Sequence, residues 1–216
     1  MNSIEIRWMS HSDMDAACEV IGLAFADNPN TLVIAQGDRV KAEQMMRIAV
    51  RIAKLGRKWS RVLVALKASR IVGVLNAVKW PNCQMRTGEK LRTAPAMIRA
   101  MGSGLPRAFR MMGVWTKHDP PKPHWHLGPI GVHPECQGQG IGKAMLASFL
   151  KVVDEQGMPA YLEADVDRNV ALYEKFGFKV IARADIAGVD NRFMWRHGSS
   201  SKDGSGLGTG GASAKA

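Results

Sequence analysis

The chain contains the hexapeptide QGQGIG at residues 137–142, between an apolar run at 125–132 and a helical pattern at 140–155. The apolar run is typical of a strand, and the spacing of the apolar residues after it predicts a helix. Glycines allow a tight turn and a close approach to a ligand, and the free N–H groups of a helix's first turn attract anions. We therefore predict a turn that binds phosphate groups.

Two other phosphate-binding loops do not fit this spacing. A Walker loop needs a glycine where Gln137 stands and a serine or threonine where Ala144 stands. A dinucleotide-binding loop needs a third glycine at the position of Lys143. Taken alone, the hexapeptide also leaves open a glycine-rich helix start that binds no ligand, so the residues that follow it are needed to decide.

A strand, a short helix and a further strand are predicted after this turn, at residues 160–164, 169–176 and 178–184. So short a succession implies a crossover connection and therefore some parallel pairing. Asn169 and Tyr173 lie four residues apart, which places them on one face of the short helix. Asn169 also has the side chain of a helix cap, so a purely structural role stays open.

The rest of the chain predicts helices on either side of a hairpin. Gly128 and Pro129 predict a bulge in the strand at 125–132, since proline cannot donate to a ladder. A last strand at 193–196 has no predicted partner, and an unpaired strand of this kind could support a homodimer. The other expected elements are a strand at 4–8, a helix at 13–25, a loop at 28–30, a helix at 40–55, strands at 62–66 and 71–78, and two helices within 91–115.

Two patterns follow each other within residues 124–178. One is Gln or Arg, any two residues, Gly, any residue, then Gly or Ala; the other is an asparagine, a tyrosine-bearing helix and a Gly-Phe turn. The matching residues are Gln137, Gly140 and Gly142 for the first, and Asn169, Tyr173, Gly177 and Phe178 for the second. In this order they resemble the GNAT acetyltransferase superfamily. The resemblance implies an α/β fold with a mixed, mostly antiparallel sheet of about six to seven strands, flanked by helices and splayed between the fourth and fifth strands.

The resemblance implies that acetyl-CoA is the acyl donor. Its pyrophosphate would bind the glycine-rich turn, and its pantetheine arm would pair with the main chain of the splayed strand like an added strand. The residues implied in coenzyme binding are Ile130, Val132, Gln137, Gly138, Gln139, Gly140, Gly142, Lys143, Asn169 and Tyr173.

Acetyl transfer from a thioester to an amine needs a proton for the leaving thiolate and a base for the amine. Tyr173 is the predicted general acid, because a phenol of pKa about 10 protonates a thiolate of pKa about 8.5 with little penalty. Glu163 and His126 are the candidate bases, with His124 as a third. The alternatives are a paired carboxylate for Glu163 and a capped or solvent-facing ring for each histidine. No metal is expected, since no third ligand stands at a convincing spacing from the two histidines.

The composition predicts a cytoplasmic protein with one acyltransferase domain, residues 1–197, and a disordered Gly- and Ser-rich tail, residues 198–216. No apolar run approaches the roughly 20 residues that cross a membrane, and the N-terminus has no signal-peptide pattern. The three cysteines are far apart in the sequence, which predicts reduced thiols.

The net charge of +11 favours an anionic partner, either a phosphorylated cofactor or a nucleic acid. The aromatic residues are scattered and no nucleic-acid-binding motif is present, which argues against a nucleic acid. A non-enzymatic module that binds acyl-CoA is the other alternative. The expected acceptor is a small-molecule amine, recognised in part by the basic segment 91–123, and both its identity and the length of the acyl chain stay open.

Overall fold

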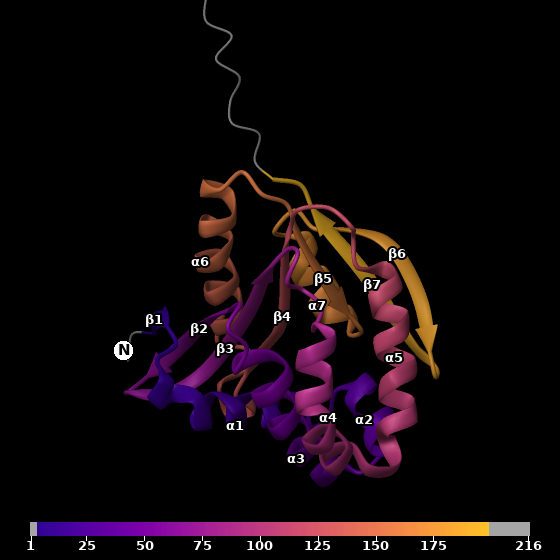
Figure 1. Ribbon diagram of the computed structural model, residues 1–216. Coiled ribbons are helices and arrows are strands. Elements are labelled where there is room, and N and C mark those ends of the chain that lie inside the picture. Colours follow the sequence, from indigo (N-terminus) through magenta and orange to yellow (C-terminus); the bar gives the residue numbers. More distant parts are fainter. Residues whose placement is uncertain (1–3, 199–216) are drawn as a thin grey trace, which may run out of the picture.

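A computed structural model of the chain describes residues 4–198, and one sheet runs through them (Figure 1). Residues 199–216, on which nearly all of the predicted tail falls, lie outside the described residues. The strands are β1 (Glu5–Trp8), β2 (Ser60–Lys67), β3 (Arg70–Lys79), β4 (Trp125–Val132), β5 (Ala160–Ala164), β6 (Lys179–Ile186) and β7 (Val189–Arg196).

The seven strands follow the order β1-β2-β3-β4-β5-β7-β6. Every neighbouring pair is antiparallel except β4 and β5, which are parallel. The predicted mixed, mostly antiparallel sheet is therefore confirmed. The strand predicted at 193–196 is the end of β7, which lies between β5 and β6 and is paired on both sides. The edges of the sheet are β1 and β6, so β7 offers no free edge to a second copy.

Helices cover both faces of the sheet. The α-helices are α1 (Met14–Phe25), α2 (Pro29–Ala35), α3 (Arg39–Val50), α4 (Thr87–Met101), α5 (Leu105–His118), α6 (Ile141–Glu155) and α7 (Asp167–Glu174). The shorter elements are the 3-10 helices η1 (His11–Asp13), η3 (Gly102–Gly104) and η4 (Pro134–Cys136), and the π-helical turn η2 (Arg51–Leu55). Among these described helices, none is both long and apolar enough to cross a membrane.

Two apolar clusters attach the helices to opposite faces. The larger one joins α6 and the Tyr173 side of α7 to inward residues of β2, β3, β4 and β5. The second joins α1 and η2 to the other face of β2 and β3. On that other face, α5 packs Val114 and Trp115 against Tyr161 of β5. The layers therefore separate α6 and α7 from α1, α3 and α5 (Figure 1).

β4 and β5 separate after only two residue pairs, Trp125 with Ala160 and His126 with Tyr161. The rest of β4 pairs with β3 alone, so the two central strands diverge toward the C-terminal end of β4. This is the predicted splay between the fourth and fifth strands. It leaves a row of main-chain groups on β4 that no strand covers.

A bulge deforms β4 where it leaves β5. The register between β3 and β4 shifts so that Gly128 and Pro129 both stand opposite Asn76. The Asn76 amide Nδ2 donates to the carbonyl of Gly128 at 2.9 Å, which replaces a bond that the disturbed ladder loses. The bulge predicted at Gly128 and Pro129 is confirmed.

Two of the predicted elements differ in the structure. The predicted loop at 28–30 is instead the start of α2, because the Asn28 side chain caps that helix by accepting from the Thr31 N–H at 3.1 Å, and Pro29 takes its first position. The predicted helix at 40–55 divides into α3 and the π-helical turn η2. The two helices predicted within 91–115 are present as α4 and α5.

Phe149 of α6 tests the larger apolar cluster. Its side chain is fully buried, with its ring edge to face against that of Trp125 at a centroid distance of 5.3 Å. We expect Phe149→Ala to lower the free energy of unfolding by about 3–5 kcal/mol, because it leaves a cavity between α6 and the sheet. Urea denaturation followed by circular dichroism measures this change.

The matched control is Phe109→Ala on α5, where the side chain is 64% exposed. We expect that variant to stay within about 0.5 kcal/mol of the parent protein. Equal losses in the two variants would contradict the role of Phe149 in the core.

Candidate active site

The glycine-rich turn joins β4 to α6. Gly138 and Gly140 have φ angles of 75° and 78°, in the left-handed region that disfavours any residue with a Cβ. Nothing lies within 4 Å of where a Cβ would stand at either position, so the backbone angle and not crowding requires glycine. α6 then begins at Ile141 with no acidic side chain in its first turn. Its free N–H groups therefore form an exposed anion site.

Side chains of the turn hold its shape. Gln137 Nε2 donates to the Val132 carbonyl at 3.1 Å, and Gln139 Nε2 donates to the Glu135 carbonyl at 3.2 Å. Gln139 Oε1 in turn accepts from Lys67 Nζ at 2.9 Å. These bonds order the turn around the helix start, and the exposed Lys143 adds a positive charge there. The sequence-predicted residues 137–143 thus come together at one surface.

The main chain of β4 faces the gap left by β5. His133 N donates to the Val72 carbonyl at 2.8 Å, so the groups of His133 point toward β3. In an antiparallel ladder the direction alternates with each residue. The N–H and C=O groups of Val132 and Ile130 consequently point away from β3, into the gap. These are the two residues predicted to pair with an extended ligand.

Tyr173 reaches the gap from the α7 side. Its side chain is 8% exposed and belongs to the same apolar cluster as α6, with Ile130 and Val132 packed against that cluster. Burial, together with the charge of Asp165, raises the pKa of the phenol, so Tyr173 holds its proton at neutral pH. Among residues 4–198, its hydroxyl makes no hydrogen bond, which leaves the proton available to a ligand.

Asn169 is half-buried and is the third residue of α7. The helix starts at Asp167 with Val166 at its cap position, so the alternative that Asn169 caps the helix is wrong. Asn169 and Tyr173 stand one turn apart on the same helix. The amide is therefore positioned beside Tyr173 and is not needed to start α7.

Glu163 and His126 approach the gap from the opposite face of the sheet. His126 Nε2 and Glu163 Oε2 lie 3.0 Å apart, and both side chains are nearly buried. Two of the three candidate bases thus form a pair. This agrees with the alternative that Glu163 is a paired carboxylate. Lys54 of η2 lies near Glu163, and its own burial lowers the pKa of the Lys54 amine. No sequence pattern singles out Lys54, because its position depends on the π-helical turn.

His124 is fully buried, so the prediction of a solvent-facing ring was wrong. It stands beside two residues that the sequence did not single out. His124 Nε2 lies 3.3 Å from Asp119 Oδ1 and 3.6 Å from Cys83 Sγ. Burial opposes protonation of His124, but the contacts with Asp119 and Cys83 outweigh it and raise its pKa to about 9.

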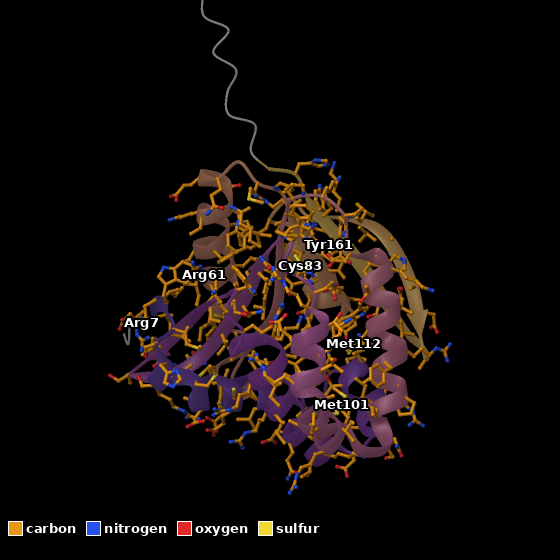
Figure 2. All side chains as sticks on the ribbon, in the orientation of Figure 1. Arg7, Arg61, Cys83, Met101, Met112 and Tyr161 are labelled. Atoms are coloured by element: carbon orange, nitrogen blue, oxygen red, sulfur yellow. The ribbon has the colours of Figure 1, made fainter. Side chains whose placement is uncertain are left out.

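His126 Nδ1 points to the same spot, 3.6 Å from Asp119 Oδ1. Cys83, Asp119, His124 and His126 can each offer one ligand atom, and these four atoms all lie within 4.8 Å of one another. Figure 2 shows Cys83 close to Tyr161 in the interior, and the His124 ring contacts both residues. The sequence spacing showed no third ligand beside the two histidines. The fold supplies candidates, because α4 and α5 bring Cys83 and Asp119 back to β4.

A family model described as "Acetyltransferase (GNAT) family" matches residues 32–178, more than half of the chain. The chain belongs to this family. The predicted family is therefore confirmed.

Among curated relatives, the chain is 44% identical over 71 residues to a mycothiol acetyltransferase of Paenarthrobacter aurescens. It is 36% identical over 67 residues to a mycothiol acetyltransferase of Streptomyces coelicolor. Each match covers 30% of this chain and 22% of the relative. The chain therefore matches only about a fifth of the length of these relatives.

Solved structures extend the likeness to nearly the whole chain. A protein of Corynebacterium glutamicum described as histone acetyltransferase HPA2 and related acetyltransferase has a TM-score of 0.64 at 19% identity, over 91% of this chain and 97% of its own. An agmatine N-acetyltransferase has a TM-score of 0.60 at 14% identity, over 90% and 99%. A GNAT-family acetyltransferase of Brucella melitensis, solved with acetyl-CoA, has a TM-score of 0.50 at 17% identity, over 91% and 89%. At these identities the comparison shows the fold.

Gly140 tests the anion site. We expect Gly140→Glu to abolish acetyl-CoA binding in isothermal titration calorimetry, because a carboxylate at the helix start repels phosphate and the left-handed φ strains any side chain. The matched control is Gly113→Glu on α5, an exposed helical position with nothing within 4 Å of its Cβ site. It should bind within about twofold of the parent protein, since surface changes of this kind stay near ±0.5 kcal/mol. Unchanged binding in Gly140→Glu would remove the turn from the coenzyme site.

Proposed function

We propose that this protein transfers the acetyl group of acetyl-CoA to the amine of a small molecule, by direct attack within a ternary complex. The observation that carries the proposal is the gap between β4 and β5. An uncovered main-chain row leads to an anion-binding helix start at one end, and a protonated, unpartnered phenol faces the row from the side. These are the three features that a phosphorylated thioester needs.

The coenzyme fits the gap by its chemistry. Its pyrophosphate would accept hydrogen bonds from the N–H groups of residues 138–143, where the helix dipole favours negative charge. Its pantetheine amides would pair with the main-chain groups of Ile130, as an added strand pairs with an edge, while the Val132 carbonyl accepts from Gln137 Nε2. This pairing would carry the thioester toward Tyr173. The Val132 N–H is then available to polarise the thioester carbonyl.

The transfer proceeds in one attack. The neutral amine nitrogen forms a bond to the acetyl carbon, and the electrons of the C=O bond move to oxygen. When the C=O bond re-forms, the C–S bond breaks and the sulfur leaves with its electron pair. Tyr173 gives its proton to that sulfur. The amine loses one proton to a base, so no covalent intermediate with the enzyme is needed.

The raised pKa of Tyr173 is compatible with this role. Burial disfavours every anion in the gap, so the pKa of the departing thiol rises there together with that of the phenol. The difference between the two pKa values governs the proton transfer. Asn169 would hydrogen-bond the coenzyme one helical turn from Tyr173.

We assign Glu163 as the base for the amine, with His126 as the group that orients it. Glu163 can reach the gap from β5, while its Oε2 accepts from His126 Nε2 at 3.0 Å. The second carboxylate oxygen remains for the amine or for a bridging water. His126 is thus a positioning residue in this assignment.

The acceptor side is formed by α4, α5 and the loops that flank them. These two helices lie on the face from which Glu163 approaches, so an acceptor bound there would meet the thioester opposite Tyr173. The named relatives include an agmatine N-acetyltransferase and mycothiol acetyltransferases, which favours a small-molecule acceptor. We propose no particular amine.

Removal of one phenol hydroxyl tests the general acid. We expect Tyr173→Phe to lower kcat by about 10²–10⁴-fold while the Kd for acetyl-CoA changes little, because the proton is needed only when the thiolate leaves. Release of free coenzyme A thiol with a panel of small amines measures turnover, and calorimetry measures binding.

Trp8→Phe is the control, since Trp8 is 48% exposed on the edge strand β1, which is separated from β4 by two strands. Its activity should stay within a few-fold of the parent protein. Equal activity of both variants would remove Tyr173 from the mechanism. Coenzyme binding without turnover on any amine would instead favour a non-enzymatic acyl-CoA-binding module.

A second pair of variants tests the base. We expect Glu163→Gln to lower kcat by about 10²–10⁴-fold at neutral pH, because the amide still fits beside His126 but takes up no proton. The exposed Glu155→Gln at the end of α6 is the control and should have normal turnover. Turnover of Glu163→Gln within a few-fold of the parent protein would rule out this carboxylate as the base.

A further inference from the structure

Four side chains direct their donor atoms to one buried spot beside the acceptor face. The atoms are Cys83 Sγ, Asp119 Oδ1, His124 Nε2 and His126 Nδ1, all within 4.8 Å of one another. We propose that this spot is a zinc site with these four residues as its complete set of ligands. The sequence led us to expect no metal, because no third ligand stood at a suitable spacing from the two histidines. The zinc proposal replaces that expectation.

Three of the six distances between the donor atoms match the edges of a zinc tetrahedron. A zinc ion with N and O ligands at about 2.0–2.1 Å and S at about 2.3 Å keeps its ligands roughly 3.3–3.6 Å apart. In the structure, Asp119 Oδ1 is 3.3 Å from His124 Nε2 and 3.6 Å from His126 Nδ1. Cys83 Sγ is 3.6 Å from His124 Nε2. These three separations are edges of such a tetrahedron.

Two of the donor atoms have no hydrogen-bond partner among residues 4–198. These buried atoms are Asp119 Oδ1 and His126 Nδ1. His126 is 7% exposed and His124 is fully buried, so both rings are shielded from bulk solvent. Neither contact between Asp119 and a histidine has hydrogen-bond geometry, although both are shorter than 4 Å. A cation at the centre would satisfy both orphaned atoms at once.

The outward-facing atoms of three ligands are held by hydrogen bonds. His124 Nδ1 lies 2.7 Å from the Lys122 carbonyl, which holds a proton on that nitrogen, so Nε2 is the nitrogen that would lose its proton to bind a metal. His126 Nε2 lies 3.0 Å from Glu163 Oε2, which leaves the lone pair on Nδ1. Asp119 Oδ2 accepts from Gln84 Nε2 at 2.6 Å. Such outer bonds orient the ligands of metal sites and select the histidine tautomer that binds.

The charges around the spot also suit a divalent cation. Cys83, Asp119 and Glu163 bring three acidic groups to one buried region, with Lys54 near Glu163. A divalent cation that displaced the ligands' protons would be held by the anionic forms of Cys83 and Asp119. A mixed set of one thiolate, one carboxylate and two imidazoles is a set that zinc accepts in tetrahedral geometry.

The site would join three separate parts of the chain. Cys83 stands before α4, Asp119 follows α5, and both histidines lie at the start of β4. Zinc would therefore fasten both ends of the α4–α5 segment to the sheet. It would also hold the proton of His126 on the nitrogen that faces Glu163, a consequence that rests on the proposed function.

Metal content tests the site without any measurement of turnover. The full chain, produced without a polyhistidine tag, is exchanged with zinc sulfate, freed of loose metal by dialysis and measured by inductively coupled plasma mass spectrometry. We expect about one zinc per chain in the parent protein and less than about one tenth of this in Cys83→Ala, which removes the thiolate ligand. Cys18→Ala, a change at another buried cysteine, is the matched control and should retain the zinc.

Cobalt(II) provides a second readout that does not depend on a folded variant. Loaded into the parent protein, it should give the thiolate charge-transfer band and the strong visible bands of a tetrahedral site. Asp119→Asn, which keeps the shape of the side chain, should weaken zinc binding by at least about tenfold. Zinc at background level in the parent protein, or full zinc in Cys83→Ala, would overturn the proposal. Coenzyme binding by a zinc-free parent protein would leave the acetyltransferase function intact.

Discussion

The parallel ladder between β4 and β5 stops after two residue pairs, and the rest of the structure depends on this early stop. Parallel strands normally continue to bond as long as both run side by side. Here the bulge at Gly128 and Pro129 turns β4 away, and the side chain of Asn76 satisfies the carbonyl it disturbs. The sheet therefore contains an edge in its middle. Edges of this kind recruit an extended partner.

The two sides of this internal edge are built differently. On one side, α6 and α7 pack through apolar contacts, and the glycine-rich turn sets the start of α6 against the end of β4. On the other side, the contacts around His126 are polar and buried, with Glu163, Asp119 and Cys83 in reach. The apolar side positions the donor by shape. The polar side is where the α4–α5 segment is attached and where the acceptor would be met.

The sequence was most informative where function depends on local backbone geometry. Gly138 and Gly140 reveal a left-handed turn through their own residue type, and the bulge at Gly128 and Pro129 needs only a proline that cannot donate. It was least informative where distant segments meet. Cys83 and His124 are 41 residues apart, and their contact depends on the path of two intervening helices.

Smaller errors have the same cause. Asn28 looks like a loop residue because Pro29 follows it, but the pair also begins a helix, and only the chain beyond it decides between the two. Asn28 Nδ2 donates to both oxygens of Asp165, at 3.0 and 2.8 Å, across 137 residues. Likewise β7 was predicted without a partner, since no short-range signal shows that a strand from the end of the chain inserts next to β5.

The separation of acid and base by the sheet follows from the alternation of side chains along β5. Leu162 joins the apolar cluster of Tyr173, and Glu163, the next residue, therefore points to the other face. An amine that loses its proton and a sulfur that gains one are on different sides of the same carbon in the collapsing intermediate. A single group serving both would have to cross the thioester between the two steps. With the proposed acid Tyr173 on one face and the proposed base Glu163 on the other, each proton would move without crossing the thioester, and the splay would open both paths to one carbon.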